Sequence, residues 1–144
     1  MKFFSIFGKK KKESEEQKPA EREKLDADAW YNKGIALGDL GRYDDAIRCI
    51  DKALKINPRY AEAWTGKGSA LGNLGRVDDA IRCFDEAIRI NPGDAKAWNN
   101  KGIALCMLGQ YDEALKSVKQ AIRINPNFAV AHQLEELILE ELKR

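Results

Sequence analysis

The sequence contains few of the residues that build catalytic or metal centres. It has one His, three Cys and no CxxC pair. No phosphate-binding glycine loop is present, and no nucleophile stands with an acid and a base in a recognisable motif. We therefore expect no enzyme activity, no cofactor and no metal site. An odd number of cysteines also argues against a disulfide framework and favours free thiols in the cytoplasm.

Long apolar runs and an excess of one charge are also missing. No stretch approaches the roughly 18 to 20 apolar residues of a membrane-spanning helix. The net charge is +2, but residues 1–24 hold eight Lys and Arg against five Glu, which leaves 17 basic and 18 acidic side chains for the rest. Because phosphate affinity comes from clustered Lys and Arg, the near-neutral remainder argues against nucleic-acid binding.

Residues 1–24 differ in composition from the rest of the chain. Phe3, Phe4, Ile6 and Phe7 precede the run from Lys9 to Lys12, and Glu, Lys, Gln and Ser dominate afterwards. This composition predicts a disordered basic tail. An alternative is weak contact of residues 1–12 with an anionic membrane surface, because aromatic side chains next to several lysines favour such a surface.

The remainder of the chain repeats every 34 residues. Trp30, Trp64 and Trp98 mark the period, and the units are 27–60, 61–94 and 95–128. Each unit begins with AxAW, contains an LG pair near its middle and ends in INP followed by two residues. A period of this length is typical of a repeat array in which each unit is one supersecondary element.

Each unit reads as two helices joined by a tight turn. A glycine stands where the first helix should end, an aspartate follows as an N-terminal cap or first-turn acid of the second, and a proline ends the second helix. These residues are Gly41, Gly75 and Gly109, then Asp44, Asp78 and Asp112, then Pro58, Pro92 and Pro126. The units are therefore predicted to be helical hairpins.

One stripe of the first helix is predicted to face its partner helix. Its members recur at spacings of three and four, and all but one are apolar or glycine. In the first unit they are Ala29, Trp30, Lys33, Gly34, Ala36, Leu37 and Leu40.

The chain resembles the tetratricopeptide repeat family. The middle unit matches the family pattern at Trp64, Gly68, Leu71, Ala80, Phe84, Ala87 and Pro92, and the outer units match with Ile50 or Val118 in place of the phenylalanine. The resemblance covers residues 27–128. It implies an all-α, right-handed α-solenoid of three helical hairpins within a domain at 25–144, and a non-catalytic protein-interaction module.

The resemblance has one consistent departure. Lys33, Lys67 and Lys101 stand where the family usually has leucine. Their stems are expected to pack while the ammonium groups reach outward.

Residues 129–143 begin a fourth unit and then leave the pattern. His132 takes the place of tryptophan and Glu136 that of glycine. The segment stays amphipathic, so it is predicted to be a capping helix with a polar outer side, in which His132 is a packing residue.

The three units differ most along one stripe of the first helix. Fifteen of the 34 repeat positions are identical in all three units, but none of positions 2, 5, 6, 9, 12 and 13 is. These positions resemble those that line the concave, peptide-binding groove of tetratricopeptide proteins. We call them the groove positions. The predicted site residues are Tyr31, Asn32, Ile35, Asp39, Thr65, Ser69, Asn73, Lys96, Asn99, Asn100, Ile103 and Met107. The other groove positions are Asp28, Gly38, Glu62, Gly66, Gly72 and Cys106, and the capping helix adds Val130, Gln133, Leu134 and Leu137.

Two ligand modes of the family bear on these positions. The first is the carboxylate clamp, which binds chaperone tails through Lys, Asn, Asn, Lys and Arg at five positions. In this sequence those positions carry Tyr31, Ile35, Gly66, Lys96 and Asn100. Only Lys96 matches, so we do not expect clamp binding. The second mode is an asparagine ladder at position 6, where Asn32 and Asn100 can donate to and accept from a peptide backbone.

The function predicted from these patterns is an adaptor that binds an extended segment of a protein partner of unknown identity. Two alternatives stay open. In the first alternative, the N-terminal tail tethers the protein to a membrane surface or a complex. In the second, the chain self-associates through its groove and capping helix.

Overall fold

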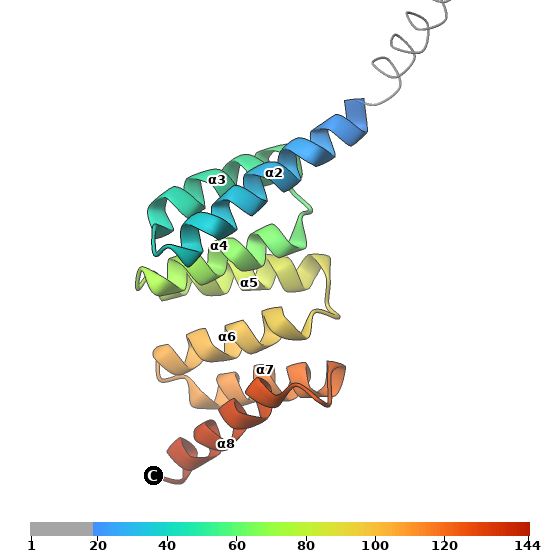
Figure 1. The fold of residues 1–144 in the computed structure, drawn as a ribbon. Helices are drawn as coiled ribbons and strands as arrows, with labels where there is room; N and C mark the ends of the chain where they lie inside the picture. Colours follow the sequence, from blue (N-terminus) through green and yellow to red (C-terminus); the bar gives the residue numbers. More distant parts are fainter. Residues whose placement is uncertain (1–18) are drawn as a thin grey trace, which may run out of the picture.

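The computed structural model describes residues 19–144, and this range folds into seven α-helices. The helices are α2 (Pro19–Asp39), α3 (Tyr43–Ile56), α4 (Ala61–Asn73), α5 (Val77–Ile90), α6 (Ala95–Met107), α7 (Tyr111–Ile124) and α8 (Ala129–Lys143). Each of the first three pairs forms a hairpin, and the hairpins stack in chain order with α8 at the end (Figure 1). The predicted all-α fold of three hairpins and a C-terminal helix is confirmed.

The first helix begins earlier than predicted. α2 starts at Pro19, so residues 19–24 are helical although the sequence was expected to be disordered up to Lys24. Proline suits the first turn of a helix because its missing N–H has no partner there, and the Glu, Arg and Lys residues that follow are good helix formers. The predicted contact of residues 1–12 with a membrane lies outside the described residues.

The hairpin turns have the predicted glycine conformation. Gly41, Gly75 and Gly109 have φ angles of +77°, +82° and +73°. In the first turn the N–H of Arg42 donates to the carbonyl oxygen of Leu37 at 2.9 Å, which closes the end of α2. Such a left-handed residue satisfies carbonyls that the helix end would leave unpaired.

The aspartates after these turns are first-turn acids and not caps. Asp44 and Asp78 lie in the first turns of α3 and α5, as Asp112 does in α7. The N-cap residues of these helices are Arg42, Arg76 and Gln110, and none makes a side-chain capping hydrogen bond. The aspartates therefore act on the positive end of the helix dipole.

Close packing inside the hairpins depends on a glycine in the first helix. At Gly68 a Cβ atom would lie 2.6 Å from Cε1 of Phe84. Because the Phe84 ring is almost completely buried, it has little freedom to move aside. Glycine at this position lets α4 and α5 approach each other.

The contacts between neighbouring hairpins, which we call the seams, repeat along the stack. Lys67 Nζ lies 2.7 Å from Asp51 Oδ1, and Lys101 Nζ lies 2.7 Å from Asp85 Oδ1. The lysines that replace the family leucine thus reach the preceding hairpin. Within residues 19–144, Lys33 forms no such ion pair, because no hairpin precedes it there.

A second recurring seam contact involves the tryptophan near the start of the first helix in each unit. Trp64 Nε1–H and Trp98 Nε1–H donate to the carbonyl oxygens of Pro58 and Pro92, each at 2.9 Å. The ring of Trp30 instead lies beneath Lys52, whose Nζ is 4.1 Å from the ring centroid. These contacts tie each inner first helix to the turn before it.

The predicted apolar stripe of the first helix packs against two neighbours, its partner helix and the preceding hairpin, and not against the partner helix alone. Ala29 and Ala36 are exposed in α2, although they were expected to face the partner helix. The equivalent Ala63 and Ala70 of α4 are buried. The difference arises because these positions pack against the preceding hairpin, which α2 lacks within the described residues.

The C-terminal helix packs against α7 through Ala131 and Ile138, which are almost completely buried. His132 Nε2 lies 2.7 Å from the carbonyl oxygen of Pro126, so it makes the contact that tryptophan makes in the other units. Leu137 and Leu139 are exposed. The outer side of α8 is therefore less polar than predicted.

None of the helices between residues 19 and 144 combines the length and apolar character that crossing a membrane requires. The three cysteines are free thiols, with Cys49 and Cys83 buried and Cys106 half-buried. Burial raises the pKa of Cys83 to about 11, so its thiol stays protonated at neutral pH.

Candidate functional site

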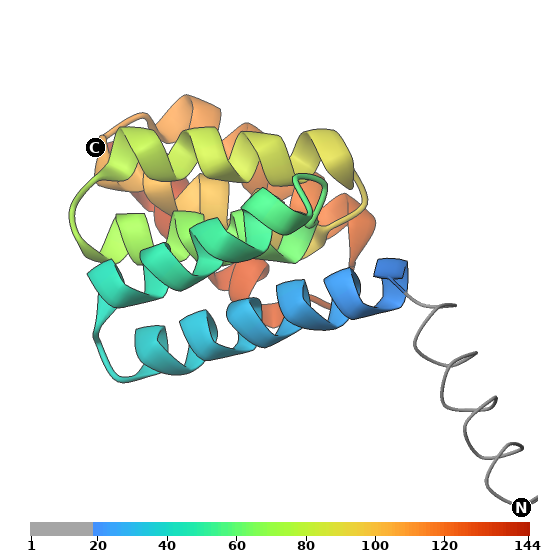
Figure 2. The ribbon, with the colours of Figure 1, turned by 90° about the horizontal axis from the view of Figure 1, so that it is seen from above.

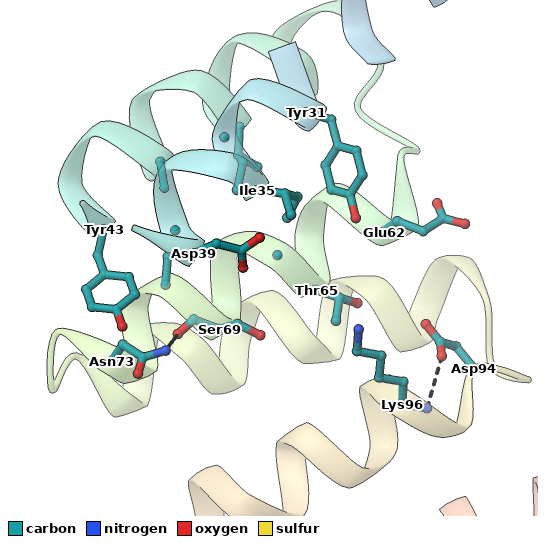
Figure 3. A pocket seen from close by; sticks show the side chains of 16 residues that line it. Tyr31, Ile35, Asp39, Tyr43, Glu62, Thr65, Ser69, Asn73, Asp94 and Lys96 are labelled. Atoms are coloured by element: carbon teal, nitrogen blue, oxygen red, sulfur yellow. Dashed lines mark hydrogen bonds between the residues drawn. The ribbon is translucent and has the colours of Figure 1, made fainter. Parts of the chain in front are cut away.

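The first helices bring their groove positions together along one face. Between α2 and α4 this face contains an open cavity of about 510 Å³ (Figure 3). Seven predicted site residues line it, namely Tyr31, Ile35, Asp39, Thr65, Ser69, Asn73 and Lys96. The predicted residues of two consecutive repeats thus share one cavity, and Lys96 reaches it from the third.

Two further cavities extend the groove toward the C-terminus. One, of about 760 Å³, runs from Glu62 past Lys96 and Asn100 to Val130 of α8. The other, of about 240 Å³, lies between α4 and α6 beside Ile103 and Met107. Asn99 lines the larger of the two, whereas Asn32 is exposed and lines none of the three cavities.

Two predicted site residues are buried and do not face solvent. Thr65 is buried and its hydroxyl donates to the carbonyl oxygen of Ala61 at 3.3 Å. Asn99 is only 3% exposed, and its Oδ1 has no hydrogen-bond partner within the described residues. Both occupy repeat position 5.

Tyr31, at the same repeat position, forms an aromatic wall at the N-terminal end. Its ring centroid lies 5.0 Å from that of Tyr60, whose hydroxyl donates to Asp28 Oδ1 at 2.7 Å. Burial and the nearby carboxylate of Glu62 raise the pKa of Tyr31. Burial and the hydrogen bond to the Asp28 carboxylate likewise raise the pKa of Tyr60. Both phenols are therefore neutral hydrogen-bonding groups at physiological pH.

The cavity between α2 and α4 has more carboxylates than cations. Asp39, Glu62 and Asp94 line it together with a single ammonium group, that of Lys96. Asp94 is the N-cap of α6 and accepts hydrogen bonds from the backbone N–H groups of Lys96 and Ala97 at 3.0 and 3.4 Å. Asp39 and Glu62 form no ion pair within residues 19–144.

Sequence reasoning missed two polar residues that line the cavity between α2 and α4 but do not lie at groove positions. Tyr43 begins α3, and its ring points into the cavity opposite Asn73 (Figure 3). Asp94 stands just before α6. An aspartate directly before a predicted helix is an N-cap signal that would have placed the Asp94 carboxylate at the groove. The position of Tyr43 depends on how the hairpin closes, and no local pattern indicates it.

The packing around Gly66 is consistent with the absence of carboxylate-clamp residues at the clamp positions. A Cβ atom on Gly66 would lie 3.1 Å from Ile35 Cδ1 and 3.5 Å from Tyr31 Cε2. The tyrosine and isoleucine side chains therefore occupy the space next to α4 that a larger side chain at position 66 would need. A clamp amide cannot be added there without moving Ile35.

A stack of α-hairpins with an open groove along its first helices defines a helical-repeat protein of the solenoid class. Family models described as tetratricopeptide repeat match residues 27–60 and 65–127. The chain belongs to the tetratricopeptide repeat family. No catalytic family matches, and no curated protein matches the chain.

Solved structures give the same fold. The first tetratricopeptide domain of Spaghetti (RPAP3), bound to the HSP90 peptide SRMEEVD, is 26% identical with a TM-score of 0.81, and the match covers 83% of this chain and 95% of that one. The first such domain of human RPAP3 is 26% identical with a TM-score of 0.80, and the match covers 82% and 93%. MamA is 25% identical with a TM-score of 0.77, and the match covers 93% and 74%.

Proposed function

We propose that the groove of this protein binds an extended, unstructured segment of a partner protein. The observation that carries the proposal is the row of cavities along α2, α4, α6 and α8, which contains most of the groove positions. Packing explains why fifteen positions are identical in all three units, but it does not explain why these polar side chains line an open groove. The peptide bound by the similar domain of Spaghetti supports this use of the fold.

Asparagine side chains in the groove suit the backbone of such a segment. Asn32 and Asn100 form no side-chain hydrogen bond within the described residues, and Asn100 lines two of the cavities. An unpaired amide can both donate to and accept from a peptide group. Four first helices about 9 Å apart give a groove of roughly 27 Å, enough for about eight extended residues.

The segment differs from the acidic chaperone tails bound by the carboxylate clamp. Four of the five clamp positions carry other residues, and Ile35 fills the space beside Gly66. We therefore propose binding without a terminal-carboxylate requirement.

Substitution of Asn100 tests the proposal. We expect Asn100→Ala to weaken binding of peptides selected from an array by about fivefold or more, because a hydrogen bond to the peptide backbone is lost. The starting affinity should be micromolar. Asn127→Ala, in the turn before α8, is the matched control. Circular dichroism should show the same helix content for both variants, and equal binding by both would count against the groove.

Self-association is a second candidate function, because α8 leaves apolar side chains on the surface. Leu137 is 59% exposed, and Leu139 and Leu142 are also exposed. A second copy that covered them would remove apolar surface from water. Light scattering over a range of concentrations tests this, and a constant monomer mass would exclude it.

A further inference from the structure

The groove has two ends of different chemistry. Repeat position 13 carries Asp39 in α2 and Met107 in α6, and position 2 carries Asp28 in α2 and Val130 in α8. The cavity that Asp39 lines holds three carboxylates, its own included, against one ammonium group. The cavity beside Met107 holds no charged side chain and is lined by Phe84, Ile103 and Ala104 together with uncharged polar residues.

Asp39 is the most informative residue of the acidic end, because a carboxylate at this position does not stabilise the helix. It is the last residue of α2, where the helix dipole is negative, and the last turn of α2 contains no basic residue. A carboxylate at this end of a helix is unfavourable, whereas a cation is favourable. Asp39 also forms no ion pair within residues 19–144 and lines the open cavity between α2 and α4. The Asp39 carboxylate can therefore bind a cationic group from outside the described residues.

Glu62 is a second carboxylate of the same cavity. It lies in the first turn of α4, so the helix dipole accounts for part of its presence. It lines the cavity next to Tyr31, and its carboxylate points away from Asp39 (Figure 3). The two rings of Tyr31 and Tyr60 stand beside it, and an aromatic face attracts a cation.

The apolar end consists of exposed side chains of α6 and α8 and of a cavity between α4 and α6. Ile103 and Met107 are 40% and 57% exposed, and Val130 and Leu137 of α8 are exposed on the same row of groove positions. The cavity of about 240 Å³ between α4 and α6 lies beside Ile103 and Met107 and reaches the Phe84 ring. A leucine or phenylalanine side chain fits such a site, because burial of its surface is favourable and methionine adapts to its shape.

We propose that the partner segment carries a lysine or arginine for the end at Asp39 and an aliphatic or aromatic side chain for the end at Met107. This inference rests on the proposed function of the groove. The two ends are separated by one to two helix spacings of about 9 Å, so roughly three to six extended residues separate the two groups. The charge that recognises the segment is opposite to the one that recognises an acidic chaperone tail.

Fluorescent peptides with blocked termini test the proposal on the full chain. The probes are KKSGSLLF, its reverse FLLSGSKK, the acidic match EESGSLLF and the polar match KKSGSSSS. We expect one of the two basic and apolar orders to bind at least about tenfold more tightly than either match at low salt, and added salt to reduce the advantage over the acidic match. The proposal would be overturned if neither KKSGSLLF nor FLLSGSKK bound more tightly than EESGSLLF, or if no probe bound up to about 1 mM.

Two substitutions locate the recognised charge. Asp39→Asn should weaken the preferred basic peptide by about three- to tenfold, while the protein unfolds at an equal or higher urea concentration because an unfavourable helix-end charge is gone. Asp44→Asn, outside the groove, is the matched control and should leave peptide affinity unchanged. Met107→Ser should weaken the same peptide and leave the weak binding of KKSGSSSS unchanged.

The same measurements separate this inference from the proposed function. Suppose that Asn100→Ala weakens all probes but Asp39→Asn weakens none. The groove then binds peptides, and the inferred chemistry is wrong. If neither substitution has an effect, both proposals fail. Residues 1–18 contain phenylalanines and lysines of the inferred kind. If replacement of Lys9 to Lys12 by serine made the preferred probe bind tenfold more tightly, the chain's own tail would be the segment that occupies the groove. The proposal of a separate partner would then be overturned.

Discussion

The inner first helices and the two end helices of the stack use the same repeat positions differently. Ala63 and Ala97 are buried against the preceding hairpin, whereas Ala29 at the same position of α2 is exposed. Leu71 and Leu105 are buried, whereas Leu139 of α8 is 39% exposed, because within residues 19–144 no second helix packs on α8 as α5 and α7 pack on α4 and α6. A repeat position therefore has no fixed environment. Its burial depends on which neighbours stand before and after it.

The two ends also differ from each other. α2 keeps the alanines, the lysine and the tryptophan of the seams although no hairpin precedes it within the described residues. α8 keeps one seam alanine, Ala131, and His132 makes the contact of the seam tryptophan. The charges of the seam ion pair are exchanged, however, because Glu135 stands at the position of Lys67 and Lys101 and Lys119 replaces the aspartate of the preceding helix. The N-terminal end thus retains the seam residues, and the C-terminal end retains them only in part.

The largest effect should come from emptying an inner core site. Leu71→Ala removes a side chain that is 3% exposed and leaves a cavity, so we expect a loss of about 2–5 kcal/mol in the free energy of unfolding. Leu139→Ala at the same repeat position should cost less than about 1 kcal/mol, because the side chain is already partly hydrated. Urea unfolding measures both, and similar losses would contradict the difference between middle and end.

A seam should also resist an added side chain. Ala63→Leu places three more carbons in a fully buried seam, so overpacking should cost about 1–3 kcal/mol. Ala29→Leu puts the same side chain on the exposed face of α2 and should change stability by less than about 0.5 kcal/mol. Thermal and urea unfolding compare the two. A comparable loss in Ala29→Leu would mean that the face of α2 is covered in solution.

The smallest effect should come from the ion pair across a seam. Lys67 is partly buried and Asp51 is about half exposed, so their coupling should be about 0.2–1 kcal/mol and should fall as salt is added. A double-mutant cycle with Lys67→Met and Asp51→Asn measures it. The same cycle on Lys119 and Glu135, which form no ion pair in this structure, should give a coupling near zero.

The helices and their turns were predictable from local patterns. The tryptophans gave the period, and the glycines with positive φ angles stand at the predicted turns. The start of α2 was not predicted, because the same Glu, Arg and Lys residues that suit a helix also suit a disordered tail. The role of Asp44 was left open between cap and first-turn acid, since one residue of difference in helix start decides between them.

The groove was predictable as a stripe but not in its detail. Eleven of the twelve predicted residues line one of the three cavities, and Asn32 does not. Thr65 and Asn99 are buried in the stack, which the periodicity of a single helix does not indicate. Tyr43 enters the groove from a second helix, and its place there depends on how the hairpin closes.

The sequence by itself determined the repeat, the hairpin and the set of side chains that can reach the groove. These follow from short-range physics, because helix periodicity, glycine conformation and proline sterics act within a few residues. The tertiary structure alone decided which alanines are buried, that Lys67 pairs with Asp51, and that Asp39 faces an open cavity without an ion pair to any described residue. Those outcomes depend on side chains that stacking brings together from different hairpins. The charge of the groove is therefore a property of the stack as a whole.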